Sequence, residues 1–299
     1  MALFIENGLN TNYKKTKCFL LSKSNFAIKM RRLKILFFWL LGHKNNISFS
    51  ELMTFLMKPK INTIAKRCIN TIEQKENIEI KFHNFNDVFH WPNSFSLDRL
   101  DQVIAETFDT NDWHYYQKEN TIVEKGEIIL DIGTAEGLFP LTVIDKCKHV
   151  YMIEPSKMFV DCLKKTFANQ LDKITIFNVA VGNEDGIIPF DENSLDGKVA
   201  LEANDNSYQI AINKIDTLLK NEKITYLKAD IEGFELEMLK GAEETIKRNK
   251  PKIAITTYHT QNNPEEIIAL IKGFVPEYNF YVKGIYEKTP KPVLIHFWI

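Results

Sequence analysis

Glycines and acidic residues stand close together at one point in the second half of this 299-residue chain. From Ile129 to Gly137 the sequence reads ILDIGTAEG, an apolar segment that leads into a glycine turn. Glycine at positions 133 and 137 lets the backbone bend tightly and approach a ligand with no Cβ in the way. The dinucleotide fingerprint G-x-G-x-x-G is absent, because position 135 is Ala. The loop therefore suits a ligand other than a pyrophosphate.

Residues farther along the chain indicate which ligand this is. Glu154 ends the next apolar segment, about 20 residues past the glycines, where a carboxylate can accept hydrogen bonds from both ribose hydroxyls of a nucleoside. The competing interpretation is an acid at the start of a helix. Asn178 and Ala180 follow the third segment and are placed to border an adenine ring. We expect S-adenosylmethionine as the cofactor, bound by Asp131, Gly133, Thr134, Gly137, Glu154, Asn178 and Ala180.

Two acids follow the fourth apolar segment, Asp230 and Glu232. We expect Asp230 beside the reacting group, where it can accept the proton of a substrate hydroxyl or hydrogen-bond to that hydroxyl. Glu232 has an alternative role as the cap of a helix that starts near Phe234. His259 follows the fifth segment and is either a general base, because neutral imidazole works near pH 7, or a loop histidine in contact with solvent. We predict catalytic roles for Asp230, Glu232 and His259.

The same three side chains could also hold a divalent metal, which would lower the pKa of an acceptor hydroxyl. Two carboxylates and one imidazole are suitable ligands. Their spacing in the sequence does not distinguish a metal site from three separate polar residues, so the sequence alone assigns no metal.

The elements that must position these side chains alternate regularly after Glu124. Short β-branched runs alternate with helical stretches, which is typical of strand–helix units in a parallel sheet. Two β-rich runs at the end of the chain predict a hairpin that adds an antiparallel strand. The expected strands are Ile128–Ile132, Val150–Ile153, Ile174–Val179, Thr225–Ala229, Ile253–Thr256, Tyr278–Lys283 and Pro292–Trp298. The expected helices are Leu138–Lys146, Lys157–Asn169, Phe234–Arg248 and one that begins at Asn263-Pro264.

Taken in order, these motifs resemble the FkbM family of methyltransferases over about residues 120–299. The resemblance implies methyl transfer from S-adenosylmethionine, usually to a hydroxyl oxygen of a sugar, lipid or secondary metabolite. It implies an α/β fold of the Rossmann-like class I methyltransferase kind, a doubly wound, mostly parallel sheet. The residues that carry it are Asp131–Gly137, Ile153–Pro155, Asn178–Gly182, Ile215–Leu219, Leu227–Ala242 and Lys250–Ile253.

The chain departs from the family's pattern at two positions. The family's glycine loop often has Asn where this chain has Ala135, so one polar contact to the cofactor is expected to be missing. The strand after Pro251 often ends in Glu in relatives, whereas here it is followed by His259. His259 is therefore expected to take over a polar role at the mouth of the site, or to accompany a different substrate.

The first 125 residues fall outside the strand–helix pattern. Residues 1–75 are predicted to form a helical N-terminal extension, and residues 76–125 an aromatic-rich connecting segment that is either core or an acceptor lid. Residues 126–299 are expected to form the methyltransferase domain. If the N-terminal part is the lid, deleting residues 1–75 should leave cofactor affinity intact and abolish transfer.

Charge and composition limit the partners. The chain has 38 basic and 39 acidic residues, and only five of the basic residues are Arg, which argues against nucleic acid. The partner we expect is a small-molecule or glycan acceptor. Four cysteines without C-x-x-C spacing favour a reduced, cytoplasmic protein.

The sequence does not decide the role of the basic and apolar segment over residues 26–41. Its apolar run, ILFFWLL, is much shorter than the roughly 20 residues needed to cross a bilayer. It is either a peripheral contact with an anionic membrane surface or a helix that docks on the methyltransferase domain. Translation from Met30 is a further alternative, which would place the apolar run near the start of the protein.

Two other functions compete with methyl transfer. One is an NAD-dependent or nucleotide-sugar oxidoreductase on a similar sheet, which the missing third glycine and the terminal hairpin disfavour. The other is a non-catalytic adenosyl-binding module, against which the intact acids at Asp131, Glu154 and Asp230 argue.

Overall fold

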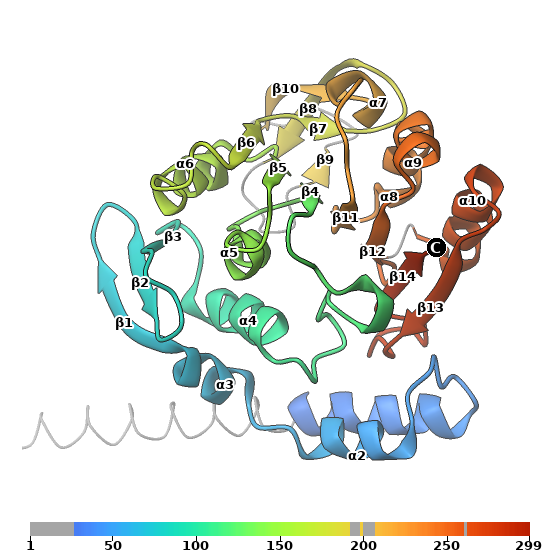
Figure 1. Ribbon diagram of the computed structural model, residues 1–299. Helices are drawn as coiled ribbons and strands as arrows, with labels where there is room; N and C mark the ends of the chain where they lie inside the picture. The colour runs from blue at the N-terminus through green and yellow to red at the C-terminus, as the bar shows by residue number, and fades with distance from the viewer. Residues whose placement is uncertain (1–26, 192–197, 200–206, 260–261) are drawn as a thin grey trace, which may run out of the picture.

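A seven-stranded sheet forms the centre of the computed structural model, which describes residues 27–191, 198–199, 207–259 and 262–299 (Figure 1). Its strands lie in the order β13-β14-β12-β11-β4-β5-β6. Five of them follow the predicted strand–helix pattern and run parallel, because each is joined to the next through a crossover. These are β4 (Ile128–Ile132), β5 (His149–Ile153), β6 (Ile174–Phe177), β11 (Tyr226–Ala229) and β12 (Lys252–Thr256).

The end of the chain forms the predicted hairpin. β13 (Asn279–Lys283) pairs with β14 (Leu294–Trp298), and β14 inserts between β13 and β12, antiparallel to both. Counted along the chain, the strand order of this sheet is 3-2-1-4-5-7-6. The sheet is therefore doubly wound and mostly parallel, and the predicted Rossmann-like class I methyltransferase fold is confirmed.

Alternate residues of each strand supply the cores on the two faces of the sheet. Ile129 and Val150 pack against helices α4, α5 and α6, while Leu130 and Ile153 pack against α7, α8, α9 and α10. Burial on both faces explains why the strands read as continuous apolar runs. The helices are α4 (Leu97–Phe108), α5 (Leu138–Val143), α6 (Lys157–Thr166), α7 (Ile215–Leu218), α8 (Glu235–Lys240), α9 (Glu243–Asn249) and α10 (Pro264–Phe274).

The helix predicted over Phe234–Arg248 is two helices. The chain breaks between α8 and α9 at Gly241, where a Cβ would lie 2.0 Å from the carbonyl oxygen of Gly182. Gly182 belongs to a region in which the sequence pattern indicated no sheet. That region forms a four-stranded sheet of β7 (Ala180–Val181), β8 (Gly186–Asp191), β9 (Lys198–Val199) and β10 (Ser207–Asn213).

The N-terminal region contains strands as well as helices. Helices cover residues 27–40, Phe49–Met57 (α2) and Ile61–Cys68 (α3), and residues 1–26 lie outside the described part of the chain. The prediction of helix up to residue 75 is wrong for β1 (Ile69–Gln74), which pairs antiparallel with β2 (Ile78–Phe82). This pairing puts Ile80 and Phe82 of β2 into the core, and β3 (Phe89–Trp91) completes the small sheet.

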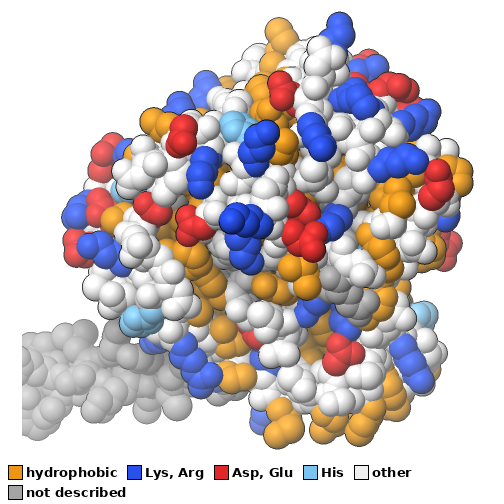
Figure 2. Space-filling model, in the orientation of Figure 1, with side chains coloured by type: hydrophobic (Ala, Val, Ile, Leu, Met, Phe, Trp, Pro, Cys, Tyr) orange, Lys and Arg blue, Asp and Glu red, His pale blue; other side chains and the backbone are white. Residues whose placement is uncertain are grey.

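The helix over residues 27–40 docks on the rest of the molecule and leaves part of its apolar surface exposed. Ile35 is fully buried among residues that include Trp113 and Leu294. On another side Leu33, Phe37 and Leu40 are each more than half exposed. Hydrophobic side chains are visible along the lower edge of the molecule in Figure 2. Among the described residues no helix has both the length and the apolarity needed to cross a membrane.

Candidate active site

A cavity of about 1140 Å³ opens at the carboxyl ends of β4, β5, β11 and β12. Doubly wound sheets bind their ligands at this edge. The loops that follow the four strands line one side of the cavity, and α4 with the segment after it lines the other. Of the predicted site residues, Gly133, Thr134, Glu154, Ala180, Asp230, Glu232 and His259 line this cavity.

The glycine loop owes its shape to close packing against the loop after β11. Gly133 has φ +68°, and a Cβ there would lie 1.9 Å from the carbonyl oxygen of Asp230. Gly137 has φ +85° and begins α5, where a Cβ would lie 2.4 Å from the side chain of Leu163. Gly137 therefore shapes the loop from behind and does not line the cavity. Ala135 also has a positive φ, +47°, which a side chain adopts at a cost.

Asp131 does not lie on the cavity wall where the sequence placed it. Its side chain is fully buried, and its carboxylate lies 3.1 Å from the Nζ of Lys228 on the adjoining strand β11. Lys228 itself lines the cavity and donates a 2.8 Å hydrogen bond to the carbonyl of Gly133. Burial by itself lowers the pKa of Lys228, but the carboxylates of Asp131 and Asp230 raise it above its usual value. The carboxylate of Asp131 therefore positions the ammonium group of Lys228, which in turn binds the glycine loop.

Glu154 lies at the end of β5 with its carboxylate fixed by backbone groups. The N–H of Ala135 donates to Oε2 and the N–H of Ser156 donates to Oε1, each at 2.8 Å. Glu154 thus bridges the glycine loop and the start of α6, as the interpretation of an acid at the start of a helix expects. Burial raises the pKa of its carboxyl to about 7. Asn178 does not line the cavity, because its amide donates to the carbonyls of Glu154 and Pro155 and supports this turn.

Asp230 receives hydrogen bonds from two hydroxyl groups. Tyr116 donates to Oδ2 at 2.8 Å, and Thr256 donates to Oδ1 at 3.0 Å. Burial alone raises the pKa of Asp230, but the neighbouring His259 and Lys228 lower it below its usual value. The carboxylate is therefore ionised and oriented at the carboxyl end of β11.

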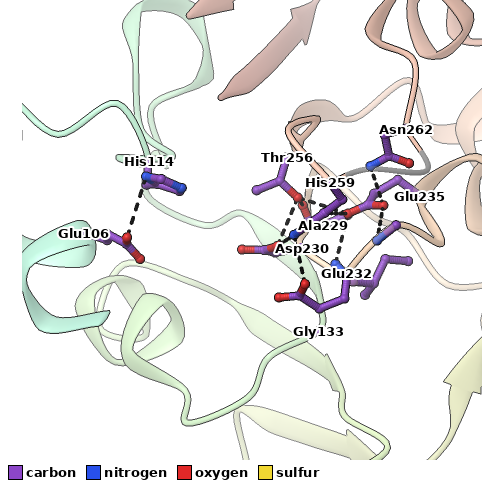
Figure 3. A network of polar contacts seen from close by, with 12 residues as sticks. Glu106, His114, Gly133, Ala229, Asp230, Glu232, Glu235, Thr256, His259 and Asn262 are labelled. Carbon is purple, nitrogen blue, oxygen red and sulfur yellow. Dashed lines mark hydrogen bonds and ion pairs between the residues drawn. The ribbon is translucent and has the colours of Figure 1, made fainter. Parts of the chain in front are cut away.

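Glu235, a residue to which the sequence drew no attention, organises the loop between Asp230 and α8 (Figure 3). It is fully buried and accepts hydrogen bonds from the backbone N–H groups of Ile231 and Gly233. The N-cap of α8 is Phe234, without a side-chain cap, and Glu235 holds the backbone that precedes it. Glu232 has φ +55°, a conformation that costs a non-glycine residue roughly 1–2 kcal/mol, and its carboxylate lies 3.2 Å from Nε2 of His259.

His259 joins these groups into one cluster (Figure 3). Its Nδ1 lies 2.9 Å from Oε1 of Glu235, and its Nε2 lies 3.7 Å from Oδ1 of Asp230. It is 7% exposed, so the alternative of a solvent-facing loop histidine is wrong. Burial alone lowers its pKa, but the carboxylates of Glu232, Glu235 and Asp230 raise it to about 11. Its imidazole is therefore charged at pH 7 in this arrangement, and a general-base role does not follow.

Residues 131–281, about half of the chain, match the Methyltransferase FkbM domain family. The match takes in the glycine loop, Glu154, the loop of Asp230 and Glu232, and His259. The chain belongs to the FkbM methyltransferase family. This membership disfavours the oxidoreductase alternative, because it assigns the sheet and its loops to a methyltransferase family.

Several solved structures are similar to this FkbM-family chain. The methyltransferase FkbM from Methylobacillus flagellatus KT is 19% identical over 82% of this chain and 60% of that protein, with a TM-score of 0.48. An rRNA methylase from Streptococcus thermophilus is 12% identical over 58% of this chain and 87% of that one, with a TM-score of 0.37. A candidate methyltransferase from Streptococcus mutans, in complex with SAH, is 13% identical over 58% and 89%, with a TM-score of 0.35. The chain spans 60% of the length of the first of these proteins. No curated protein matches it at a significant level.

In this FkbM-family chain the wall opposite the sheet comes from the aromatic-rich segment. Tyr116, His114 and Glu106 line the cavity, and Tyr116 reaches across to Asp230. Burial alone lowers the pKa of His114, but Glu106 and Asp112 raise it to about 9. Other rings of the segment, among them Phe89 and Trp91, are fully buried core residues.

Two further residues of the site had signals in the sequence. Lys228 is a charged residue inside an apolar strand, two positions before Asp230. Glu136 lies inside the glycine motif, lines the cavity and is 8% exposed, and burial raises the pKa of its carboxyl to about 7. Both are ionisable groups in places where an unpaired charge is costly, which marks them as candidate site residues.

Proposed function

We propose that the chain is an S-adenosylmethionine-dependent methyltransferase that methylates a hydroxyl oxygen of a sugar, glycolipid or secondary metabolite. The observation that carries the proposal is the placement of Glu154 and Asp230 on one cavity, at the ends of β5 and β11. One carboxylate suits the ribose end of a nucleoside cofactor, and the other suits the reacting end. Membership of the FkbM family supports this activity.

The residues around Glu154 fit an adenosyl group. Its two oxygens are oriented by backbone N–H groups and lie at the cavity wall, where ribose hydroxyls can donate to them. Pro155, Phe159 and Ala180 line the same part of the cavity and provide apolar surface for a purine ring. The glycine loop, with Gly133 and Thr134 on the wall, borders the amino-acid end.

Asp230 and the loop after β11 would orient the acceptor. Methyl transfer from a sulfonium is an in-line displacement, so catalysis depends mainly on holding the acceptor oxygen in line with the methyl group. The acceptor oxygen forms a bond to the methyl carbon, the carbon–sulfur bond breaks, and S-adenosylhomocysteine leaves as the neutral thioether. The hydroxyl proton passes to a carboxylate or to water. Asp230 accepts the hydrogen bond of that hydroxyl, and the acids Glu232 and Glu235 favour the positive charge of the sulfonium.

The N-terminal region would cover the acceptor side. Tyr116 and His114 from the aromatic-rich segment and Ile61 at the start of α3 reach the cavity wall. We therefore place the acceptor between the sheet edge and α4, with the N-terminal region as its lid.

We further propose that the exposed apolar surface beside this lid rests on an anionic membrane. Leu33, Phe37 and Leu40 share one face of the helix over residues 27–40, and Phe49 and Met57 share one face of α2. The ring of Trp39 lies 6.0 Å from that of Phe49, so the two helices are in contact. Exposed lysines at positions 29, 34 and 44 accompany them. Apolar side chains flanked by lysines match the chemistry of an anionic lipid surface.

Calorimetric titration of the purified protein with S-adenosylmethionine, S-adenosylhomocysteine and NAD tests the main proposal. We expect micromolar binding of both adenosyl compounds and none of NAD. Glu154→Ala should weaken the adenosyl binding by about tenfold to a hundredfold, because hydrogen bonds to a charged group are lost. Glu265→Ala, which removes an exposed acid on α10, should leave it unchanged.

The same experiment separates the competing functions. Binding of NAD alone, or of none of the three compounds, would overturn the methyltransferase proposal. Adenosyl binding without turnover of any hydroxylated acceptor would favour a non-catalytic adenosyl-binding module.

A further inference from the structure

The cluster at the end of β11 and β12 has the geometry of a metal site. Asp230, Glu232 and His259 each offer one ligand atom, and these atoms lie within 4.8 Å of one another. Nε2 of His259 is 3.2 Å from the carboxylate of Glu232 and 3.7 Å from that of Asp230. For metal–ligand bonds of about 2.1 Å, two neighbouring ligand atoms lie roughly 3.0–3.4 Å apart. One ion can therefore contact all three groups after only small side-chain adjustments.

The imidazole of His259 is oriented as a metal ligand is. Its Nδ1 contacts the fully buried carboxylate of Glu235, which also accepts a 2.6 Å hydrogen bond from the amide of Asn262. A carboxylate that holds one ring nitrogen of a histidine fixes the tautomer and turns the other nitrogen toward the metal. Nε2 of His259 is buried, has no hydrogen-bond partner of good geometry among the described residues, and points at the two acids. Among the described residues, the lack of a well-formed hydrogen bond at this buried nitrogen is an observation that adds to the two acids.

The side chains of Asp230 and Glu232 are also held in fixed orientations. Asp230 is fixed by the hydroxyls of Tyr116 and Thr256, so its carboxylate cannot turn away. Glu232 is directed at His259 from a backbone conformation, φ +55°, that a side chain adopts at an energetic cost. Such strain is retained where the surrounding structure requires a side chain to point in one direction.

We propose that Asp230, Glu232 and His259 bind one divalent cation of the Mn²⁺ or Zn²⁺ class. Two carboxylates with one imidazole suit these ions, whereas Ca²⁺ prefers oxygen ligands throughout. The cluster lines the cavity, so water and an acceptor hydroxyl can fill the remaining coordination positions. The use of the ion rests on the proposed methyl transfer: it would lower the pKa of the acceptor hydroxyl, whose proton then leaves more readily. The proposal that the three side chains bind an ion rests on their geometry and does not depend on the methyl transfer.

Metal binding is measured directly on the full-length protein after treatment with a chelator. The protein is titrated with Mn²⁺, and binding is detected by calorimetry and electron paramagnetic resonance. A parallel calorimetric titration uses Zn²⁺. Both titrations give the stoichiometry and the affinity. We expect one ion per chain. Asp230→Asn and Glu232→Gln should each weaken binding by about tenfold or more, as losses at metal sites do.

Glu237→Gln is the matched control. Glu237 lies on α8 and lines the same cavity, and its carboxylate contacts Lys240. This variant should bind Mn²⁺ as the wild type does. Glu232 is about one-third exposed, so Glu232→Gln reports on the site without disturbing the core.

S-adenosylhomocysteine, titrated on the same preparations, distinguishes the two proposals. Wild-type protein that binds S-adenosylhomocysteine but no Mn²⁺ or Zn²⁺ at millimolar concentration overturns the metal site and leaves the methyltransferase function standing. The three side chains would then form an ion-pair cluster around a protonated His259. Protein that binds the metal and loses it in both variants, yet binds no adenosyl compound, supports the metal site and overturns the function.

Discussion

Two buried carboxyls, those of Glu136 and Glu154, make the cavity sensitive to pH at the scale of single residues. Burial raises the pKa of each to about 7. At these two carboxyls the folded, cofactor-free protein therefore binds more protons than the unfolded chain between about pH 4.5 and pH 7. The contribution of these two groups to the free energy of unfolding should therefore fall as the pH rises through that window. Burying these two carboxyls on the cavity wall therefore lowers the free energy of unfolding at neutral pH, where the unfolded chain carries them as solvated carboxylates.

Adenosyl binding should depend on pH because ribose hydroxyls donate to the ionised form of Glu154. With a pKa of about 7, the fraction of free protein that carries this carboxylate is small at pH 6 and nearly complete at pH 8. We expect the Kd of S-adenosylhomocysteine to be about tenfold higher at pH 6 than at pH 8. Glu154→Gln should bind weakly and lose most of this dependence. Calorimetry at both pH values measures it, and a flat wild-type profile would assign the ribose contact to another group.

At the scale of elements, the site depends on how closely two loops approach each other. The loop after β4 meets the loop after β11 at Gly133, and the buried ion pair of Asp131 with Lys228 lies beneath this contact. Lys228 and Asp131 are register partners on neighbouring parallel strands. The separation of the glycine loop from Asp230 is therefore set by the pairing of β4 with β11.

Gly133→Ala tests this close approach, with Gly126→Ala as its control. Both glycines have positive φ, but a Cβ at Gly126 meets no atom within 4 Å, whereas at Gly133 it meets a backbone oxygen. Gly126→Ala should cost only the backbone strain of roughly 1–2 kcal/mol. Gly133→Ala should cost at least about 2 kcal/mol more, because the loops must separate, and should weaken S-adenosylhomocysteine binding. Chemical denaturation and calorimetry measure both effects, and equal costs would show that the loops move apart freely.

At the scale of the whole molecule, the N-terminal region and the sheet form one body. Phe55 of α2 stacks on Trp113 with ring centroids 4.4 Å apart, and Trp113 packs against Leu294 of β14. Deleting residues 1–75 would remove β1 and α3 together with these helices. Loss of transfer in that truncation would therefore not separate a lid from a damaged core, and point substitutions in the cavity wall are the sharper test.

The exposed apolar face of the same region predicts binding to anionic vesicles. Wild-type protein should sediment with phosphatidylserine-containing vesicles and not with neutral phosphatidylcholine vesicles, because both apolar contact and lysine charge are needed. The double variant Leu33→Glu, Phe37→Glu should lose this binding. Leu171→Glu with Ile187→Glu is the matched control, since these two side chains are 63% and 73% exposed elsewhere. Absence of sedimentation, or a dimer that only the first double variant dissociates, would assign the face to another occupant.

The sequence by itself determined the strand–helix order, the terminal hairpin and the carboxyl-end position of Glu154, Asp230 and His259. It could do so because burial of parallel strands and glycine turns leaves a local pattern of residue types. For the aromatic-rich segment the sequence left core and acceptor lid as alternatives, and the structure places the rings of Phe89 and Trp91 in the core.

Only the tertiary structure decided which partner each polar side chain has. Asp131 pairs with Lys228, 97 positions away in the chain, and Tyr116 reaches Asp230 across 114 positions. Such pairs leave no periodic signal, because their residues meet only after the strands have taken their register and α4 has packed on the sheet. The same holds for Glu235, which accepts a hydrogen bond from the backbone before α8, while Glu232 faces His259. Burial and long-range pairing bring these acids together in one site, and no local sequence pattern records either of them.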